Sequence, residues 1–241
     1  MESLRYEHQI NAIGPHGQKK IYNSSVFIVG CGGLGCPVSL YLTASGVGEI
    51  SIIDDDVISV SNLHRQKLFD ERDVGKPKVM VAAEKLRKIN SATRLNVYRD
   101  RISKHNAEKY LEGHDLVILG CDNFLTRYIV NDACCRLNIP FINASVQGDE
   151  GSLSYFDIEH GCYRCIFPEI PPDLVLPTPE EAGVLGPVVG VIGTAAATLA
   201  VHILTGNYEH YLNTIYNFDS TTLQMNTYSF TKESCCQGCK N

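Results

Sequence analysis

The chain has 241 residues, of which 44% are hydrophobic and 20% charged, and its formal net charge is −6. A chain of this length can bury a substantial core and suits one domain over residues 1–241, and the negative charge argues against nucleic acid as a partner. The amino-terminal MESLRYEHQI has no apolar signal core, so we expect a cytoplasmic protein that does not associate with a membrane. Without a signal sequence, the ten cysteines favour metal-binding or structural thiols over disulfides.

In chain order, the sequence predicts a helical arm, then alternating strands and helices, then a last third of different character. Alternation of this kind predicts an α/β fold with a Rossmann-like, doubly wound and mainly parallel sheet, which the last strands extend in antiparallel orientation. A proline-rich crossover loop as long as 166–187 is usually functional, for example as a cover over a site. The run 184–204 contains glycines and polar residues, which favours a loop and a buried helix over a membrane span. The predicted segments are a helix or arm at 1–24, strands at 26–29 and 50–53, a helix at 76–90, a strand at 94–98, a helix at 106–112, a strand at 116–119, a helix at 124–137, strands at 141–144 and 151–157, a helix at 188–204, and strands at 214–217 and 223–228.

The run VFIVGCGGLGCPVSLYLTASGVGEISIIDDD at residues 26–56 predicts a nucleotide-binding unit. A first apolar run enters the turn Gly30-Cys-Gly-Gly-Leu-Gly35, a helix-like segment follows, and a second apolar run ends at Asp54. Glycines permit the tight turn and let the backbone approach phosphates, and the amino terminus of the helix offers free N–H groups to an anion. Asp54 is placed to accept hydrogen bonds from a ribose.

Charged side chains follow the predicted strands where ligands bind to open parallel sheets. The run Asp54–Asp56 forms a carboxylate cluster at one strand end, and Asp122 in Gly120-Cys-Asp-Asn123 follows another strand. A carboxylate near a nucleotide phosphate is a natural Mg²⁺ ligand. Arg65 and Lys78, each taken alone, would be solvated charges, but the surrounding SNLHRQ motif favours a functional role.

Two Cys-x-x-Cys pairs give a second strong signal. We call each Cys-x-x-Cys pair a hook. Two hooks together supply the four ligands of tetrahedral Zn²⁺, and a closed site of four thiolates is structural rather than catalytic. Such a site would fix the carboxy-terminal tail, residues 229–241, to the rim of the sheet. Free surface thiols or a redox pair are the alternative, and Cys235 could take the place of Cys236. The expected zinc ligands are Cys162, Cys165, Cys236 and Cys239. The other cysteines are expected to be small buried hydrophobes: Cys31, Cys36, Cys121, Cys134 and Cys135.

Together these motifs resemble the ThiF/MoeB/HesA superfamily, whose members are relatives of the ubiquitin-activating enzymes. The resemblance covers nearly the whole chain. Its length and DDDV segment look most like ThiF, which serves thiamin biosynthesis, with MoeB, which serves molybdopterin, close behind. The resemblance is carried by the run from GCGGLGC to SNLHRQ, GKPK at 75–78, GCDN at 120–123, GCYRC at 161–165, AGVLGPVVGVIGT at 182–194 and the terminal Cys-x-x-Cys.

The resemblance implies an ATP-dependent adenylyltransferase that acts as a homodimer. Its implied substrate is the terminal glycine carboxylate of a small ubiquitin-like sulfur carrier of the ThiS/MoaD type, which ends in Gly-Gly. Catalysis would consist mainly of positioning and of neutralising phosphate charge. The implied catalytic residues are Arg65, Lys78 and Asp122, with Asp122 also holding Mg²⁺. The implied nucleotide-binding positions are Gly30, Gly32, Gly33, Leu34, Gly35, Asp54, Asp56, Asn62, Arg65, Gln66, Lys78, Asp122 and Asn123.

The chain departs from the family pattern at two places. Family members commonly begin R-Y-x-R-Q, where the second arginine reaches ATP in the neighbouring subunit. Here His8, shorter and only partly charged near neutral pH, holds that position, so either Arg5 or another cation substitutes or phosphate stabilisation is weaker. Relatives that form a covalent sulfur link carry a cysteine where this chain has Pro179. We therefore expect an enzyme that stops at, or hands on, the acyl-adenylate.

Three other functions compete with this one. A peptide activated at its carboxy terminus in a natural-product pathway is compatible with the same residues. A non-catalytic scaffold for a ubiquitin-like protein is supported only by His8 and Pro179, and a scaffold would have no use for the phosphate-site residues. A nicotinamide-dependent hydride-transfer enzyme would need neither SNLHRQ nor the cysteine hooks.

Overall fold

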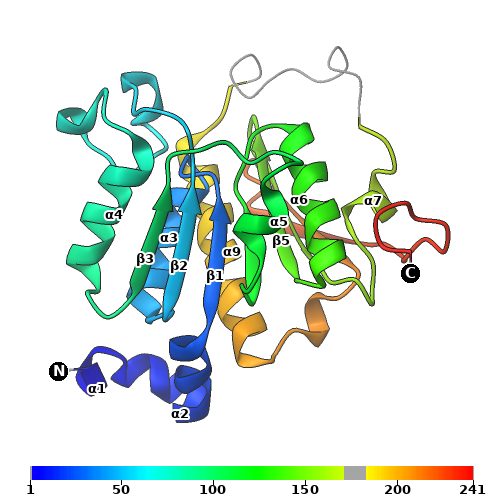
Figure 1. Cartoon of the computed structure of the whole chain (residues 1–241), viewed down its shortest axis with the longest axis horizontal. Helices are drawn as coiled ribbons and strands as arrows, with labels where there is room; N and C mark the ends of the chain where they lie inside the picture. The colour runs from blue at the N-terminus through cyan, green and yellow to red at the C-terminus, as the bar shows by residue number, and fades with distance from the viewer. Residues whose placement is uncertain (1, 171–182, 241) are drawn as a thin grey trace.

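A computed structural model describes residues 2–170 and 183–240, and in this part of the chain there is one eight-stranded sheet whose parallel strands lie between two layers of helices (Figure 1). The strand order is β3-β2-β1-β4-β5-β6-β7-β8, with β1 to β5 parallel and β6 to β8 added in antiparallel orientation. This arrangement confirms the predicted fold class. The strands are β1 (Ser25–Val29), β2 (Glu49–Ile53), β3 (Arg94–Tyr98), β4 (Leu116–Leu119), β5 (Phe141–Gln147), β6 (Glu150–Phe156), β7 (Thr214–Asp219) and β8 (Gln224–Ser229).

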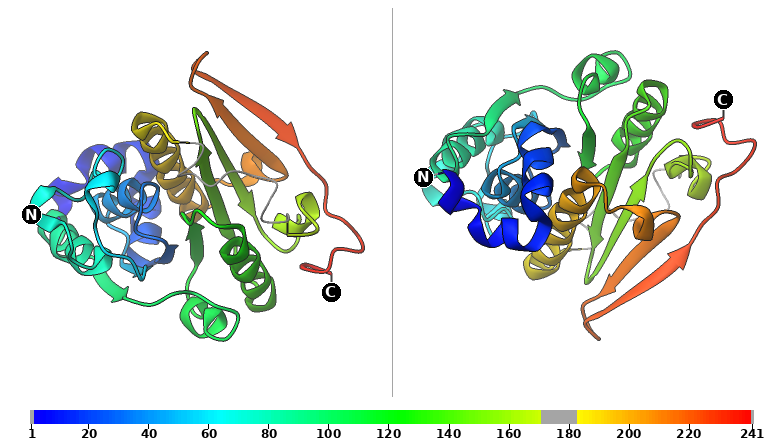
Figure 2. Two further views of the ribbon diagram at one scale, coloured as in Figure 1. Left: turned by 90° about the horizontal axis from the view of Figure 1, so that it is seen from above. Right: turned by 90° about the horizontal axis from the view of Figure 1, so that it is seen from below.

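Helices cover both faces of the parallel strands, as a doubly wound sheet requires. Figure 2 shows α3, α4 and α9 on one face and α5 and α6 on the other. The amino-terminal α2 packs on α9 at the end where the parallel strands begin, and it is broken at Gly14, whose φ is +74°. The helices are α1 (Glu2–Arg5), α2 (Glu7–Asn23), α3 (Gly35–Ser45), α4 (Lys78–Ile89), α5 (Ala107–Leu111), α6 (Phe124–Leu137), α7 (Tyr163–Ile166) and α9 (Gly186–Thr205), with short 3-10 turns at Val60–Asn62, Glu71–Asp73 and Glu209–Tyr211.

The central strands are buried on both faces, which explains their continuous apolar sequences. In β1, Val26 and Ile28 face the core beneath α3 and α9, whereas Phe27 and Val29 face the core beneath α5 and α6. Side chains alternate between the faces of a strand, so a strand between two layers needs apolar residues at every position. For this reason the strand positions could be predicted closely from sequence.

Three predicted boundaries differ from the structure. The crossover loop was expected over 166–187, but Ile166 ends α7 and α9 already begins at Gly186. Pro187 suits the first turn of a helix, because its missing N–H would have no partner there. The tail expected from residue 229 begins one residue later, because Ser229 pairs with Thr214 as the last residue of β8. Pro179 lies outside the described residues.

Helix α9 is long and apolar enough to cross a membrane by length and composition, with a mean hydropathy of 1.9. Half of this apolar window is buried inside the protein, where α9 packs against α2, α3, β5 and β6. The burial fits the predicted core helix.

Candidate nucleotide-binding site and metal centre

A cavity of about 350 Å³ lies at the carboxyl ends of β1, β2 and β4. The strand order reverses between β1 and β4, and such a switch point is where open α/β sheets bind ligands. Every position predicted to contact nucleotide lines this cavity except Gly35. The predicted residues that line it are Gly30, Gly32, Gly33, Leu34, Asp54, Asp56, Asn62, Arg65, Gln66, Lys78, Asp122 and Asn123.

The glycine turn is built by close backbone packing. Gly30 has a φ of +97°, a conformation that favours glycine. A Cβ at this position would lie 3.0 Å from the carbonyl oxygen of Gly120, which follows β4. A Cβ on Gly35 would overlap the Gly30 carbonyl oxygen, so only glycine fits at the start of α3. Gly35 therefore shapes the turn but does not line the cavity, and its predicted contact with nucleotide stays a prediction.

Asp54 ties the turn to the end of β2. Its Oδ2 accepts a hydrogen bond from the Cys31 N–H at 2.7 Å, and its Oδ1 accepts one from the Asp56 N–H at 2.9 Å. Burial raises the pKa of Asp54, although the nearby Lys78 cation and these two hydrogen bonds oppose the rise. Each carboxylate oxygen keeps a second lone pair, so the side chain can still accept hydrogen bonds from a ribose.

Two predicted cations stand on the side of the cavity next to the turn. The buried Nζ of Lys78 lies 2.8 Å from Asp56 Oδ2. Burial would lower the pKa of Lys78, but attraction to Asp54 and Asp56 outweighs it and raises the pKa above its usual value, so the side chain is charged. Arg65 donates from Nη2 to Asn62 Oδ1 at 2.9 Å. Both cations are thus held in place beside the turn.

The other wall of the cavity follows β4. Asn123 caps α6, because its Oδ1 accepts a hydrogen bond from the Thr126 N–H at 2.8 Å. Asp122 is exposed and has neither a hydrogen bond nor an ion pair with any residue that the structure describes. A free carboxylate at a strand end is suited to a hard cation such as Mg²⁺.

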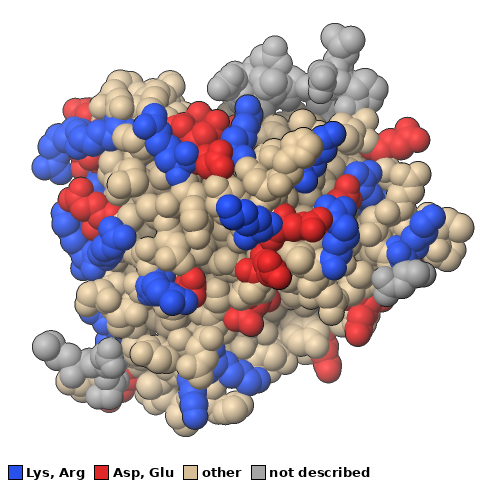
Figure 3. All heavy atoms as spheres, viewed as in Figure 1, with Lys and Arg blue, Asp and Glu red and all other residues tan. Residues whose placement is uncertain are grey.

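Sequence reasoning missed part of this lining: Asp100, Arg101, Ile102 and Arg127. Arg127 lies four residues after Asn123 on α6, and this spacing, which places two residues on one side of a helix, could have identified it. The charged side chains around the cavity are of both signs, and acidic and basic groups also lie side by side on the face in Figure 3. The cavity is therefore suited to a phosphate ligand accompanied by a cation.

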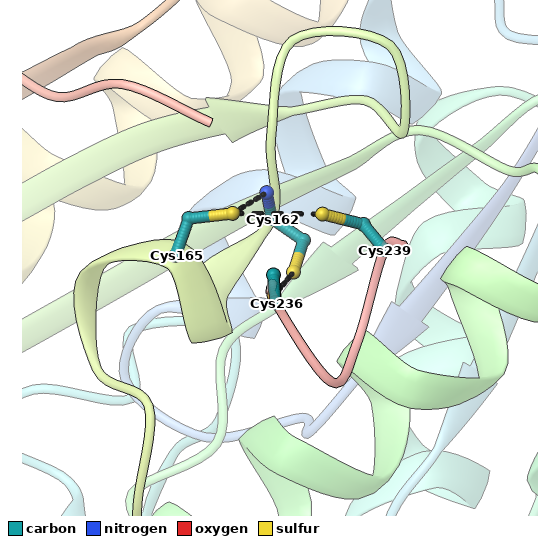
Figure 4. Close-up of side chains that lie close together, drawn as sticks. All are labelled: Cys162, Cys165, Cys236 and Cys239. Carbon is teal, nitrogen blue, oxygen red and sulfur yellow. Dashed lines mark hydrogen bonds between the residues drawn. The ribbon is translucent and has the colours of Figure 1, made fainter. Parts of the chain in front are cut away.

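The two cysteine hooks meet in one closed cluster (Figure 4). The four Sγ atoms lie within 4.8 Å of one another, with Cys162–Cys236 at 3.6 Å and Cys165–Cys239 at 3.5 Å. Tetrahedral Zn²⁺ with Zn–S bonds of about 2.3 Å would separate its sulfurs by about 3.8 Å. The cluster therefore fits zinc, and it contains Cys236 rather than the exposed Cys235.

Backbone and side-chain donors surround the cluster. The N–H groups of Glu233 and Gly238 point at the sulfurs of Cys165 and Cys236, at 3.5 and 3.4 Å. Cys135, predicted to be only a small buried hydrophobe, packs in the same cluster. Its hydrogen bond to Cys162 lowers the pKa of the Cys162 thiol to about 5, although burial alone would raise it. Of the other cysteines, Cys31, Cys36 and Cys134 are buried as predicted, whereas Cys121 lines the nucleotide cavity.

The first hook, Cys162–Cys165, packs against α6, the helix whose first turn borders the cavity. The Tyr163 N–H donates to Asn131 Oδ1 at 2.8 Å. Arg164 donates two hydrogen bonds to Asp132, at 2.6 and 2.8 Å, and its guanidinium lies 4.7 Å from the centre of the Tyr128 ring. Helix α6 therefore contacts the cavity at one end and the cysteine cluster along its later turns.

The sequence matches known proteins over nearly its whole length. A sequence model described as ThiF family matches residues 6–239. The chain is 41% identical over 210 residues to a sulfur carrier protein adenylyltransferase of Thermus thermophilus, covering 84% of this chain and 78% of that protein. It is 38% identical over 242 residues to the adenylyltransferase and sulfurtransferase MOCS3 of Xenopus laevis, covering 99% of this chain and 54% of MOCS3. The chain thus spans about half the length of the MOCS3 relatives it matches.

Solved structures of the E. coli enzyme MccB have the same fold. A structure of MccB with ATP superposes with a TM-score of 0.87 and 28% sequence identity, covering 98% of this chain and 75% of that one. A structure of the Microcin C7 biosynthetic enzyme MccB in complex with N-formylated MccA has a TM-score of 0.86 and 28% identity, covering 98% of this chain and 74% of that one.

Proposed function

This chain belongs to the ThiF family, and on that premise we propose that it is an adenylyltransferase that activates the terminal glycine carboxylate of a small ubiquitin-like sulfur carrier protein. The observation that carries the proposal is the cavity at the β1/β4 switch point. It combines a glycine turn, a ribose-binding acid, two cations and a free carboxylate in one place. The Thermus relative bears the name of this activity, and MccB is a fold neighbour solved with ATP.

The proposed reaction joins the carrier to AMP. An oxygen of the terminal carboxylate attacks the α-phosphorus of ATP, the bond from that phosphorus to the bridging oxygen breaks, and pyrophosphate leaves with the bond electrons. Both partners are anions, so the protein must align them and offset their charge. The product is an acyl-adenylate. We propose no covalent link to the protein, because Pro179 stands where the cysteine of thioester-forming relatives would be.

Residues of the chain supply the positioning. Backbone N–H groups of the turn residues 32–34, at the amino terminus of α3, face the phosphates, and Asp54 accepts hydrogen bonds from the ribose. Arg65 and Lys78 offset phosphate charge from the side of the turn. Gln66 lines the cavity, and its Oε1 is buried without a hydrogen-bond partner among the described residues, which supports its proposed place in the nucleotide site.

Two metals complete the proposal. Asp122 is the proposed ligand of Mg²⁺, which would offset charge on the triphosphate when bound. The four clustered cysteines are the proposed ligands of Zn²⁺, with a structural role, because four thiolates leave no open position.

We also propose that the protein works as a cytoplasmic homodimer in a ThiS/MoaD-type pathway, with thiamin biosynthesis the first candidate. Arg5 and His8 do not line the chain's own cavity, and Arg5 donates instead to the Ile89 carbonyl oxygen at 2.9 Å. A cation from the amino-terminal arm could therefore reach this site only from a second copy.

A second candidate function is the activation of a peptide at its carboxy terminus. The observation that favours it is the similarity to MccB, which has been solved in complex with N-formylated MccA. Both candidates use a terminal carboxylate and the same cavity, so they differ only in the acceptor.

The test is ATP–pyrophosphate exchange with candidate carriers and peptides. We expect exchange that depends on a carrier ending in Gly-Gly and that falls at least about 100-fold in Asp122→Asn, because the loss of a charge-stabilising group typically costs this much. The control is Glu112→Gln, an exposed carboxyl at the amino-terminal end of β4, which should keep wild-type exchange. Exchange that depends on a peptide alone would support the second candidate, and an absence of exchange with every acceptor would contradict both.

A further inference from the structure

Arg127 is a cation of the cavity wall that the nucleotide-binding pattern does not use. It lies in the first turns of α6, after Asp122 and Asn123, and it lines the cavity together with Ser145 and Val146 of β5. We propose that Arg127 binds the terminal carboxylate of the acceptor and holds it against the α-phosphate. This inference rests on the adenylyltransferase function proposed above and adds the contact that recognises the acceptor.

The guanidinium of Arg127 is fixed but has hydrogen-bonding capacity left. Nη2 donates to the Cys121 carbonyl oxygen at 3.1 Å, and the group packs 5.5 Å from the centre of the Phe124 ring. Nε is buried without a hydrogen-bond partner among the described residues, and the guanidinium also interacts with the Tyr163 hydroxyl, where it opposes the rise that burial causes in the pKa of Tyr163. Unlike Lys78, Arg127 forms no ion pair with a described carboxylate. A half-buried guanidinium without a counter-ion is suited to bind an anionic ligand.

The sheet topology indicates which anion this is. The ribose-binding Asp54 follows β2 and the glycine turn follows β1, so the proposed nucleotide occupies that side of the cavity. Asp122 and Arg127 follow β4, and Ser145 belongs to the neighbouring β5. Adjacent strands lie about 4.8 Å apart, so Arg127 stands beyond the phosphate turn, on the side opposite the ribose. An acceptor that attacks the α-phosphorus from beyond the turn would pass this residue.

Charge and shape support the same assignment. A carboxylate that approaches a triphosphate is repelled by it, and a cation beside the carboxylate reduces that repulsion. The planar guanidinium can donate two parallel hydrogen bonds to a carboxylate, and Lys78 and Arg65 already have partners on the turn side. The contacts of Arg127 with Cys121 and Phe124 hold the group in place, which reduces the entropy lost on binding.

The test compares carriers that end in a carboxylate with carriers that end in a carboxamide. Affinities are measured by calorimetry in the presence of a non-hydrolysable ATP analogue, for wild type, Arg127→Gln and Arg127→Lys. Wild type should prefer the carboxylate by roughly 10- to 100-fold, the range for a hydrogen bond to a charged group. Arg127→Gln should lose this preference. Arg127→Lys keeps the positive charge but cannot donate two parallel hydrogen bonds, so it should keep part of the preference. Affinity for the ATP analogue should change less than about threefold in both variants, and retention of that affinity reports an intact fold.

Arg136→Gln is the matched control, because Arg136 lies on the same helix but pairs with Glu108 on the surface. It should keep the wild-type preference. The assignment is overturned if Arg127→Gln keeps the full preference, or if both Arg127 variants lose affinity for the ATP analogue and for both carriers alike. Absence of any acceptor-dependent exchange in wild type would overturn the proposed function itself, which separates the two failures.

Discussion

The nucleotide cavity and the cysteine cluster differ in how well their polar groups are satisfied. Around the cavity, Gln66 Oε1 and Arg127 Nε lack partners among the described residues, and the Asp122 carboxylate is free. In the cluster, each sulfur of the first Cys-x-x-Cys pair contacts a sulfur of the second pair, and backbone N–H groups point at the sulfurs. Buried polar groups without partners are costly, and at the cavity the proposed ligand would offset that cost. With the proposed function, the first region is a site for exchangeable ligands and the second is a site that holds the fold together.

The same helix serves both regions. The amino-terminal end of α6 carries Asn123 and Arg127 at the cavity, and its later turns carry Asn131 and Asp132, which hold the first hook. Changes in the cluster should therefore act mainly on stability, whereas changes at the cavity should act mainly on ligand binding. The following predictions test this division, from the largest expected effect to the smallest.

Loss of the cluster should cause the largest change in stability. We expect Cys239→Ser to lower the free energy of unfolding by more than about 4 kcal/mol, because loss of a bound structural metal is among the costliest single changes. Denaturant unfolding with and without a zinc chelator measures it. Cys235→Ser is the matched control, because Cys235 is exposed and outside the cluster. Equal stabilities of the two variants would contradict a structural zinc site.

A side chain at the glycine turn should damage both the fold and ligand binding. In Gly35→Ala the added Cβ meets the Gly30 carbonyl oxygen, and we expect a loss of about 3 kcal/mol together with weak ATP binding. Gly190→Ala is the control, because no atom lies within 4 Å of a Cβ placed there in α9. That variant should gain about 0.5–1 kcal/mol. An unchanged ATP affinity in Gly35→Ala would show that the turn does not hold the nucleotide.

The docking of the hook on α6 should contribute a smaller amount. We expect Arg164→Gln to destabilise the protein by about 2 kcal/mol, because the variant leaves the partly buried Asp132 carboxylate without a counter-ion, with only the hydrogen bond from Asn131 Nδ2 remaining. Urea unfolding measures the change. Lys88→Gln, which breaks the exposed pair with Glu84, should cost under about 0.5 kcal/mol. A lower ATP affinity in Arg164→Gln, with little loss of stability, would contradict the division between the two regions.

The smallest expected effect is a pH dependence at the cavity. Burial raises the pKa of Asp54 above its usual 3.8, so the folded state holds this proton more tightly than the unfolded state. Its contribution to stability is therefore present at low pH and is lost as the pH rises through the folded pKa. Asp54→Asn removes this titration. The stability of Asp54→Asn relative to wild type should increase from pH 3.5 to pH 7.5 in urea unfolding, and a constant difference would contradict the proposed cost of this buried charge.

Much of this organisation could be predicted from sequence, for physical reasons. The runs 26–29 and 116–119 are apolar throughout because both faces of the strands are covered. The glycine turn and the cysteine hooks are local spacings whose geometry follows from the backbone. Residues brought together only by packing were missed. Arg127 faces the cavity because α6 lies against β4 and β5, and Cys135 meets Cys162 because the hook docks on α6. Gly35 shows that packing alone can require a glycine in such a motif, because a Cβ there would overlap the Gly30 carbonyl oxygen.

The central claim is that an oxygen of the acceptor carboxylate forms a bond to the α-phosphorus of ATP. The most direct measurement starts from a Gly-Gly carrier whose terminal carboxylate is labelled with heavy oxygen, incubated with the enzyme, ATP, Mg²⁺ and hydroxylamine. Hydroxylamine attacks the acyl carbon of an acyl-adenylate, so the oxygen between carbon and phosphorus stays with AMP. We predict labelled AMP and unlabelled pyrophosphate. Unlabelled AMP, or label in inorganic phosphate beside ADP, would contradict adenylation.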